Sequence, residues 1–411
     1  MEALLSSELL LPLYLHRIDR MLLYLRLQAA QVELFNQELR TLSQDKASSG
    51  GMHVFARLCI ASQPISGVIT KGKQVEEASV IVKLIFGVTM RFSSVSHMKV
   101  SVLWDDQQAR IASSAEKSLL EVDVLPLDVY RFQTHWKHKF STGTRKTPIF
   151  LRYSLSVRLS ESHPPFEIRS EWSRPYIVIT NDCQWYEAEG KLIQHWLFKP
   201  GALPWPLVAN TIQRHFLEGT RQDPAQAQRI LFANEFHYFF VTLFCNKHPV
   251  TAVQFDQFWE WFGKCLQRLR YQRHVGTLFL QGYLQGFLTK QACINILSNQ
   301  PIGTFLIRFS ESYPGCFAVT YRAMATNSPD AIRHYLLKAD DISGPKHTIA
   351  DFLGDQIALT HMLRFGQKPD GKPTITGRAP KDEILGALYA KKAPVSTADG
   401  YDTRIHTVKS F

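Results

Sequence analysis

The spacing of apolar residues divides the chain into regions with different periods. In the first region, apolar positions recur every three or four residues, with Asn36 filling the one gap. These positions are Leu11, Leu15, Ile18, Leu22, Leu25, Ala29, Val32 and Leu39. This seam predicts a coiled-coil-like helix within 1–47, although an amphipathic helix packed on the rest of the protein has the same period. Ser48-Ser49-Gly50-Gly51 then predicts a break.

The segment 52–180 has an all-β pattern, and we assign 52–199 to one β-barrel domain. Its apolar segments are rich in Val, Ile, Leu and Phe, several alternate with polar positions, and turn residues separate them. We expect strands at 53–60, 78–92, 99–104, 119–124, 148–159 and 176–180. Because no convincing helix intervenes, these strands predict a sandwich or a barrel.

Helical periodicity returns in 200–275. Pro204-Trp205-Pro206 predicts the start of one helix, and Asp223-Pro224 predicts the start of the next. A third helix is expected over 253–271, with aromatic residues along one face. This region therefore predicts a helical domain.

A small α+β module is predicted over 276–365, and a tail over 366–411. In the module, Thr289 caps a helix that runs to 297, and a second helix is expected over 348–362. The strands between them are expected at 304–309, 316–321 and 333–337. Gly, Pro, Lys and Ala dominate the tail, which predicts mostly linker with a short helix over 381–389.

Composition narrows the class of protein. Of the 411 residues, 45% are apolar, so the chain can bury sizeable cores, and a net charge of +11 favours a polyanionic partner. The six cysteines lie too far apart for a paired metal or redox motif and suit a reducing compartment. The Leu-rich start lacks a basic leader and contains Glu2 and Glu8, so we expect neither a signal peptide nor membrane insertion.

The sharpest candidate for chemistry is Arg308, which lies in the middle of an apolar strand. A buried guanidinium is costly unless an anion meets it, and its planar fork suits bidentate contact with phosphate. Ser310 and Ser312 follow at the turn and could donate hydroxyl groups, while Lys290 could add a charge. The alternative is an internal ion pair between Arg308 and Glu311 or another acid of the same chain.

These residues carry a resemblance to a known family. Phe287-Leu288-Thr289-Lys290, followed by the segment Pro301 to Ser312, closely resembles the Src-homology-2 (SH2) domain of the STAT transcription factors. The resemblance implies phosphotyrosine binding by Arg308, Lys290, Ser310, Glu311 and Ser312. Arg333-His334-Tyr335 looks more like the general SH2 pattern than the STAT one, and this likeness implies that His334 lines the same pocket.

The resemblance continues upstream and covers about 52–411. The segment Ser173 to Asn181, with Gln184-Trp185, looks like the last strand of the STAT DNA-binding β-barrel, and Phe258-Trp259-Glu260-Trp261 looks like the STAT linker. It implies a multidomain α+β protein with an immunoglobulin-like barrel, a helical linker and an SH2 domain. The family's long four-helix coiled coil has no counterpart in 1–47, which has room for one helix.

A basic run supports DNA as a partner independently of the resemblance. No Asp or Glu lies between 131 and 158, where there are seven Lys and Arg residues. Such a run can neutralise phosphates and release counterions. Arg145 and Lys146 are expected at a loop tip, and Asn181 follows a strand end, where it could bond base edges. The family likeness places Lys99, Arg145 and Asn181 at DNA-facing loops, whereas any one of them could equally be solvated surface.

The tail carries a candidate for modification at Tyr401, in the sequence Asp399-Gly400-Tyr401-Asp402. In the STAT family, a tail tyrosine in a similar context is phosphorylated and docks into the pocket of a second copy. The resemblance therefore implies a homodimer held by two reciprocal contacts and a tyrosine kinase as a partner. Tyr389 is the rival tyrosine, and docking of the tail on its own pocket stays open.

These expectations combine into one function and one alternative. We expect a phosphotyrosine-activated, DNA-binding transcription factor that moves between cytoplasm and nucleus, and not an enzyme; the alternative is a cytoplasmic phosphotyrosine adaptor that does not bind DNA. No cofactor is expected. The pairs His135/His138 and Cys245/His248 could each ligate zinc, but neither has a second pair at useful spacing, so no metal site is expected.

Overall fold

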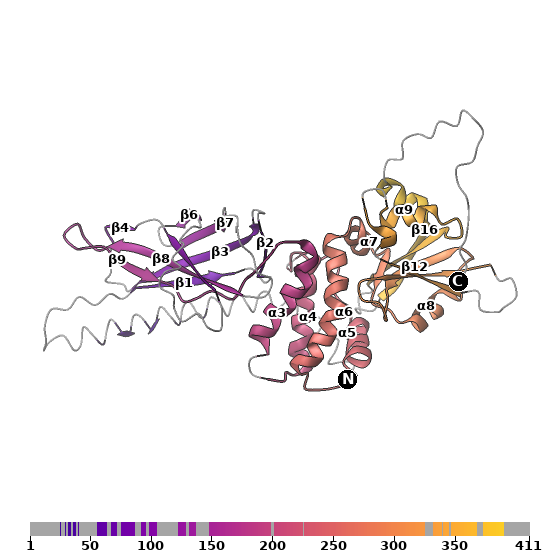
Figure 1. Cartoon of the computed structure of the whole chain (residues 1–411), viewed down its shortest axis with the longest axis horizontal. Coiled ribbons are helices and arrows are strands. Elements are labelled where there is room, and N and C mark those ends of the chain that lie inside the picture. The colour runs from indigo at the N-terminus through magenta and orange to yellow at the C-terminus, as the bar shows by residue number, and fades with distance from the viewer. Residues whose placement is uncertain are drawn as a thin grey trace, which may run out of the picture. The chain divides into compact units, whose positions relative to one another are not determined.

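The protein is described by a computed structural model (Figure 1). The structure describes 56–63, 67–71, 75–86, 92–95, 98–104, 122–128, 131–136, 148–198, 201–224, 226–324, 332–338, 340–344, 347–367 and 373–389, together with seven single positions between 25 and 40. The chain forms two compact units, divided after Gln272, with two short segments (312–315 and 367–373) assigned to the first unit. In the part that the structure describes, no helix has the length and apolar character needed to span a membrane.

Most of the predicted N-terminal seam lies outside the described residues. Three of its apolar positions, Leu25, Ala29 and Val32, are helical and exposed, with 56% of Leu25 and 55% of Val32 exposed. The coiled coil stays a prediction. The structure pairs Glu33, beside this seam, with Arg57 at 3.7 Å.

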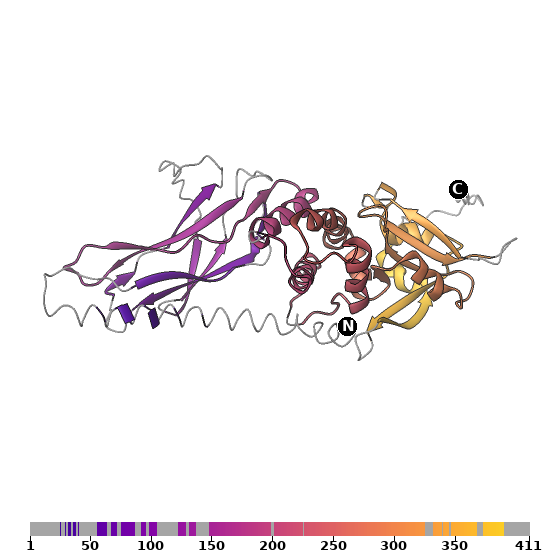
Figure 2. The same ribbon diagram turned by 90° about the horizontal axis from the view of Figure 1, so that it is seen from below.

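The first unit begins with an all-β region, as expected (Figures 1 and 2). One antiparallel sheet has the order β1-β3-β7-β6, formed by Ala56–Ser62, Val75–Phe86, Arg131–Trp136 and Val122–Asp128. A second sheet has the order β4-β8-β5 with β9 beside β8, formed by Ser94–Val95, Ile149–Arg158, Lys99–Trp104 and Phe166–Arg169. A parallel pair joins β2 (Val68–Thr70) to β10 (Ile177–Ile179).

Alternation along β8 builds the core of this region. Ile149, Leu151, Tyr153, Leu155 and Val157 are all buried and pack in one cluster with residues of β1 and β3. The predicted strand over 148–159 is thus confirmed within one residue at each end. Strands β2, β4, β7 and β9 were not predicted, because three are very short and β7 was taken only as part of the basic run.

Four α-helices follow in the same unit: α3 (Trp185–Leu197), α4 (Trp205–Gly219), α5 (Ala233–Tyr238) and α6 (Ala252–Tyr271). The predicted third helix matches α6 within one residue at its start. Helices α3 and α6 approach closely, because a Cβ atom at Gly190 of α3 would lie 2.5 Å from the Trp259 ring of α6. The helix α3 lies beyond the segment 52–180 in which strands were expected, but within 52–199, the range assigned to the β-barrel domain, so the end of that range is helical.

The predicted helix start at Asp223-Pro224 is also wrong. The described residues from 226 to 232 form turns and irregular structure, and the next helix begins at Ala233. The Glu235 carboxylate accepts the Phe232 amide at 2.8 Å and so caps α5. A polar cluster around Arg229, described below, holds the preceding segment outside a helix.

The second unit is built on one mixed sheet. Its order is β14-β13-β12-β15-β16, with β11 also beside β12. The strands are β11 Leu284–Gly286, β12 Thr304–Phe309, β13 Phe317–Arg322, β14 Ile332–Leu337, β15 His361–Gln367 and β16 Pro373–Pro380. Helix α7 (Val275–Leu280) precedes the sheet.

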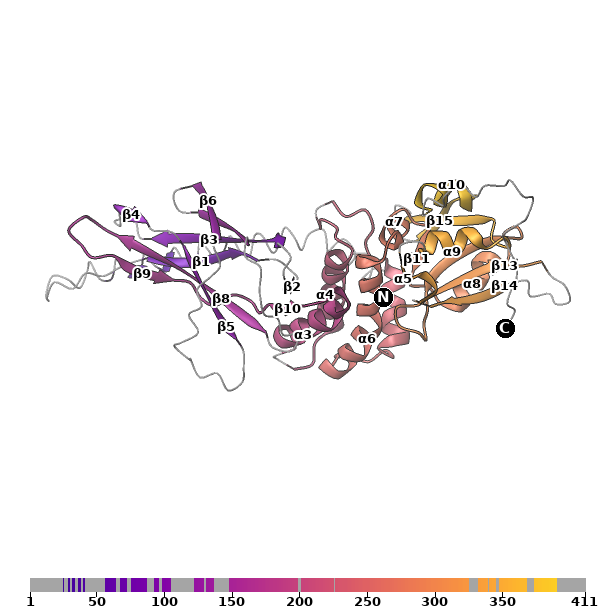
Figure 3. The ribbon, with the colours of Figure 1, turned by 45° about the horizontal axis from the view of Figure 1, so that its top comes forward.

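Two helices cover the two faces of this sheet (Figures 1 and 3). Helix α8 (Lys290–Leu297) packs Cys293 and Leu297 against Leu306, while α9 (Ile349–Asp355) stacks Phe352 on Tyr335, which faces the other side. The predicted Thr289 cap and the bounds of β12 are confirmed. The predicted helix over 348–362 is too long, because α9 ends at Asp355 and the chain turns into β15.

The expectation of mostly linker after 366 is wrong for 373–389. Strand β16 completes the sheet, and α10 (Lys381–Leu385) follows it beside α9 (Figure 3). The Lys381 ammonium group is buried and donates to the carbonyls of Leu353, Gly354 and Gln356 at the end of α9. The segment 381–389 is therefore anchored to the second unit.

Candidate functional site

Arg308 is the candidate site's central residue, and β12 buries it. All six residues of this strand are buried, and 5% of Arg308 is exposed. Its cross-strand neighbours are small, Ala318 in β13 and Gly286 in β11, which leaves room for the long side chain. One terminal nitrogen donates to the Phe309 carbonyl at 3.0 Å, whereas Nε is buried without a hydrogen-bond partner among the described residues.

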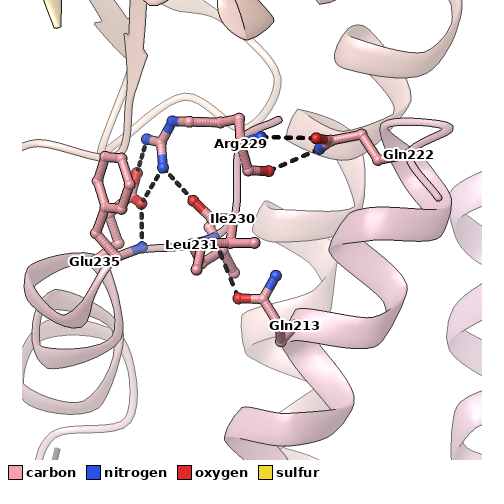
Figure 4. Close-up of polar contacts among 7 residues, drawn as sticks. Gln213, Gln222, Arg229, Ile230, Leu231 and Glu235 are labelled. Carbon is pink, nitrogen blue, oxygen red and sulfur yellow. Dashed lines mark hydrogen bonds and ion pairs between the residues drawn. The ribbon is translucent and has the colours of Figure 1, made fainter. Parts of the chain in front are cut away.

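The buried Arg229 of the helical region offers an internal comparison (Figure 4). Its two terminal nitrogens donate to the two carboxylate oxygens of Glu235 at 3.1 and 2.9 Å, one of them also donates to the Ile230 carbonyl, and the guanidinium lies 3.6 Å from the centre of the Phe232 ring. Gln222 fixes the backbone of Arg229 through two further hydrogen bonds of 2.8 Å. This chain thus provides a complete bidentate partner for one buried arginine.

Among the residues that the structure describes, Arg308 has no bidentate partner of this kind. Glu311 Oε1 lies 3.7 Å from its terminal nitrogen, which exceeds a hydrogen-bond distance. The expected alternative, an internal ion pair with Glu311, therefore exists only as a long contact. An incompletely paired, buried guanidinium is the arrangement that favours binding of an external anion.

The first turn of α8 lies beside this guanidinium. Thr289 caps the helix by accepting the Ala292 amide at 3.1 Å, and the Lys290 amide donates to Glu311 Oε1 at 2.8 Å. The Lys290 side chain is exposed. A helix N-terminus and a lysine together add positive potential next to Arg308, so the site combines three sources of attraction for an anion.

His334 joins the site from β14. Its Nδ1 atom lies 3.0 Å from the Thr320 hydroxyl of β13, directly across the strand pair. Burial and, to a smaller degree, the charges of Lys290 and Arg308 together lower the pKa of His334 to about 4. The imidazole is therefore neutral near pH 7.

Sequence reasoning missed two residues of this site. Cys293 of α8 is fully buried; burial raises the pKa of its thiol to about 11, against the opposing charge of Arg308. Thr320 is also fully buried. A buried thiol and a buried threonine look like ordinary core residues in a sequence, so only the fold reveals their position beside Arg308 and His334.

The two predicted serines differ in exposure. Ser310 is 6% exposed and its amide donates to the Cys316 carbonyl at 2.9 Å, whereas Ser312 is exposed. The second unit thus brings together Arg308, Lys290, Glu311 and His334, with Ser310 two residues after Arg308. Tyr401 lies outside the described residues.

The predicted DNA-binding residues are only partly described. Lys99 is exposed on β5, and Arg145 and Lys146 lie outside the described residues. Asn181 is exposed, and its side chain accepts the Cys183 amide at 3.1 Å, so it caps the short helix η1 (Asp182–Gln184). This hydrogen bond gives Asn181 a structural role besides any contact with a base.

The basic run from 131 to 158 has acidic neighbours in the fold. The register of β6 and β7 places Asp128 opposite Arg131 and Asp123 opposite His135. On β9, burial favours the neutral form of Glu167, but hydrogen bonds from Arg169 and Ser154 and the charges of Arg169 and Lys99 lower its pKa overall. Acidic residues from other strands therefore stand at positions across from part of the basic run, although the run itself contains none.

Among the described residues, no group of three or more His, Cys, Asp and Glu side chains is arranged to hold a metal ion. His248, which was weighed with Cys245 as a zinc pair, accepts the Trp205 amide at 3.1 Å through Nδ1. His138, from the second pair, lies outside the described residues.

Comparisons with known proteins match each region in turn. The STATa immunoglobulin-like domain matches 56–179, an EF-hand fold domain matches 181–272, and the SH2 domain matches 283–351. Two Dictyostelium discoideum proteins match most of the chain. "Signal transducer and activator of transcription B" is 33% identical over 97% of this chain and 37% of its own length. "Signal transducer and activator of transcription A" is 32% identical over 92% of this chain and 52% of its own length.

A solved structure, "Inactive choanoflagellate E3 ubiquitin ligase Cbl TKB", matches 51% of this chain and 54% of its own, with 14% identity and a TM-score of 0.22, too low to support an argument. The chain spans about half or less of the length of the two curated relatives. Its immunoglobulin-like domain, helical region and SH2 domain occur in one continuous order, and both relatives align over nearly all of it. The chain is a STAT-like protein.

Proposed function

We propose that this protein is a DNA-binding transcription factor that is activated by tyrosine phosphorylation and dimerises through reciprocal contacts between its SH2 domain and a phosphorylated tail. The observation that carries the proposal is the incompletely paired, buried guanidinium of Arg308. Both relatives are named as signal transducers and activators of transcription. Because they are much longer than this chain, the activity and the partners are proposed for it.

Phosphotyrosine fits the chemistry of the site. A phosphate monoester brings roughly −1.5 to −2 charges and three acceptor oxygens. Arg308 offers a planar donor fork, Lys290 a flexible ammonium, and Ser310 and Ser312 two hydroxyl groups on the loop that follows β12. The neutral imidazole of His334 can donate one hydrogen bond without adding charge.

The proposed ligand is phosphorylated Tyr401 of a second copy. The chain is anchored as far as Tyr389, so about 12 residues separate the anchored segment from Tyr401, with an extended reach of roughly 40 Å. In a two-fold dimer the second contact forms at an effective concentration that can reach the millimolar range. Docking of the tail on its own pocket remains the competing arrangement.

DNA is the proposed partner of the immunoglobulin-like domain, through Lys99, Arg145, Lys146 and Asn181. The net charge of +11 and the basic run support this partner. A tyrosine kinase would act on the cytoplasmic protein, and the dimer would act in the nucleus. The cytoplasmic adaptor is the second candidate, favoured by the acidic residues that the fold places opposite part of the basic run.

A peptide titration tests the phosphotyrosine part of this proposal. A synthetic peptide of residues 396–406 is prepared with Tyr401 either phosphorylated or unmodified, and binding is measured by calorimetry. We expect the phosphorylated peptide to bind wild-type protein and to lose at least tenfold in affinity with Arg308→Leu, since a charged hydrogen-bonded partner is removed. Equal binding of the two peptides would refute phosphotyrosine recognition.

A DNA titration separates the two candidate functions. The phosphorylated protein is added to mixed-sequence duplexes at several salt concentrations. The transcription-factor proposal expects affinity that falls steeply with salt and that weakens when Arg145 and Lys146 are both replaced by Ala. No duplex binding at low salt would favour the adaptor.

A further inference from the structure

Glu311 contacts two positively polarised groups of the candidate site, the Lys290 amide and the Arg308 guanidinium. One carboxylate oxygen, Oε1, accepts the Lys290 amide at 2.8 Å and lies 3.7 Å from a terminal nitrogen of Arg308. The same oxygen thus satisfies the first amide of α8 and faces the guanidinium. The Glu311 side chain is 35% exposed, whereas that of Arg308 is 6% exposed, so the carboxylate reaches solvent while the guanidinium is buried.

Glu311 contacts Arg308 only weakly, so an external anion could displace it. Its distance to Arg308 is longer than a hydrogen bond, and Arg308 Nε stays without a hydrogen-bond partner in the described structure. Glu235 shows what a permanent partner looks like in this chain, because it binds Arg229 with both oxygens and is 1% exposed. Glu311 instead faces the Arg308 guanidinium with one oxygen, and its partly exposed side chain can turn toward solvent.

Electrostatics favours a phosphate dianion over the Glu311 carboxylate as the acceptor for these donors. A phosphate dianion can accept hydrogen bonds from Arg308 and from the α8 amide together, which Glu311 does only loosely. A carboxylate and a dianion cannot share these donors without repulsion. Binding therefore requires Glu311 to release the Lys290 amide, and the free energy of that release is subtracted from the affinity for every anion.

We propose that Glu311 is an internal competitor of the phosphate ligand, not one of its contacts. It neutralises part of the positive potential while the site is empty, and it leaves when a strong dianion arrives. This inference rests on the proposed phosphotyrosine site and gives Glu311 the opposite role from the one that the family resemblance implies. Weak anions then fail to open the site, which confines binding to ligands with further contacts.

The test is the isosteric replacement Glu311→Gln. The Gln side-chain oxygen can still accept the Lys290 amide, so the first turn of α8 keeps its hydrogen bond while the competing charge disappears. The matched control is Glu383→Gln, an exposed residue of α10 in the same unit, which changes the net charge equally. The probes are the phosphorylated Tyr401 peptide, phenyl phosphate and sulfate, measured by calorimetry and by ligand-observed NMR.

We expect Glu311→Gln to bind all three probes about fivefold more tightly than wild type, by a similar factor for each, since each displaces the same carboxylate. Glu383→Gln should change each affinity by less than about twofold, through long-range charge alone. The Lys290 amide signal should move on ligand binding in the wild type, because its acceptor changes.

Three outcomes would overturn the inference. Equal or weaker binding by Glu311→Gln, while the wild type still binds the phosphopeptide, would make Glu311 a contact or a bystander and leave the proposed function intact. A gain confined to the peptide would point to residues beyond the phosphate. Absence of phosphopeptide binding in both proteins, each with an unchanged melting temperature, would refute the proposed function and the inference together.

Discussion

Nδ1 of His334 lies 3.0 Å from the hydroxyl of Thr320, where β14 and β13 pair beside Arg308. Burial, together with the charges of Lys290 and Arg308, lowers the pKa of His334 from its usual value near 6.5 to about 4. The unfolded chain therefore binds more protons than the folded one between these two values. The stability that the neutral imidazole contributes is complete above about pH 6.5 and declines as the pH falls toward 4.

We predict that acid destabilises the second unit through this residue. Between pH 6.5 and 4, wild type should lose about 1 kcal/mol of unfolding free energy more than His334→Gln, after allowance for the partial exposure of the imidazole. Urea denaturation at several pH values, followed by fluorescence, measures the difference. Parallel pH profiles for the two proteins would show that His334 does not titrate as described.

Replacement by leucine should change the free energy of unfolding much more at the buried Arg229 than at the buried Arg308. Arg229→Leu leaves the Glu235 carboxylate buried and unpaired, so we expect a loss of about 3–5 kcal/mol of unfolding free energy. Arg308→Leu leaves only the partly exposed Glu311, which can turn to water, so stability should stay within about 1 kcal/mol of wild type. Thermal and urea unfolding of both variants measure these values.

One result would contradict this prediction. Should Arg308→Leu unfold as readily as Arg229→Leu, the guanidinium of Arg308 would be part of the structural core, and the loss of peptide binding in that variant would carry no information about a ligand.

Gly354 and Tyr389 form a contact that fixes the end of the described chain. A Cβ atom on Gly354 would lie 2.6 Å from the Tyr389 ring, and the Tyr389 hydroxyl donates to Asp382 at 2.7 Å. We predict that Gly354→Ala costs about 1–3 kcal/mol and that adding Tyr389→Ala recovers part of this loss. A double-mutant cycle by chemical denaturation gives the coupling. Strictly additive effects would mean that the anchor yields without strain.

Asn181 allows its structural and DNA-binding roles to be separated. Asp is an equally good helix cap, so Asn181→Asp should keep the hydrogen bond to the Cys183 amide and the melting temperature. Its negative charge should weaken duplex binding about tenfold or more if Asn181 faces DNA. Asn181→Ala is the control that loses the cap. Unchanged duplex affinity in Asn181→Asp would remove this residue from the proposed interface.

The sequence predicted the elements whose signals are local. Thr289 and the alternation through Arg308 gave α8 and β12 their bounds, because a cap and a strand period depend on neighbouring residues. Strand β7 escaped notice because its polar residues gain strand structure from pairing with β3 and β6, which are distant in sequence. For the same reason, the helix expected at Pro224 yielded to the contacts of Arg229.

The candidate site was likewise predicted where its signals are local and missed where they depend on packing. A cation in an apolar strand identified Arg308, the position of Lys290 at the start of the preceding helix suggested a second charge, and the family resemblance added His334. The contact of Glu311 with the Lys290 amide and the position of Cys293 depend on how α8 packs on the sheet. No pattern within either segment contains that information.

Light scattering before and after treatment with a tyrosine kinase measures the mass of the protein in solution and so tests reciprocal docking of the tail. We expect a monomer of 47.0 kDa that becomes a dimer on phosphorylation, and no dimer for Tyr401→Phe or Arg308→Leu. A fully phosphorylated wild-type protein that stays monomeric, or a Tyr401→Phe protein that still dimerises, would contradict it.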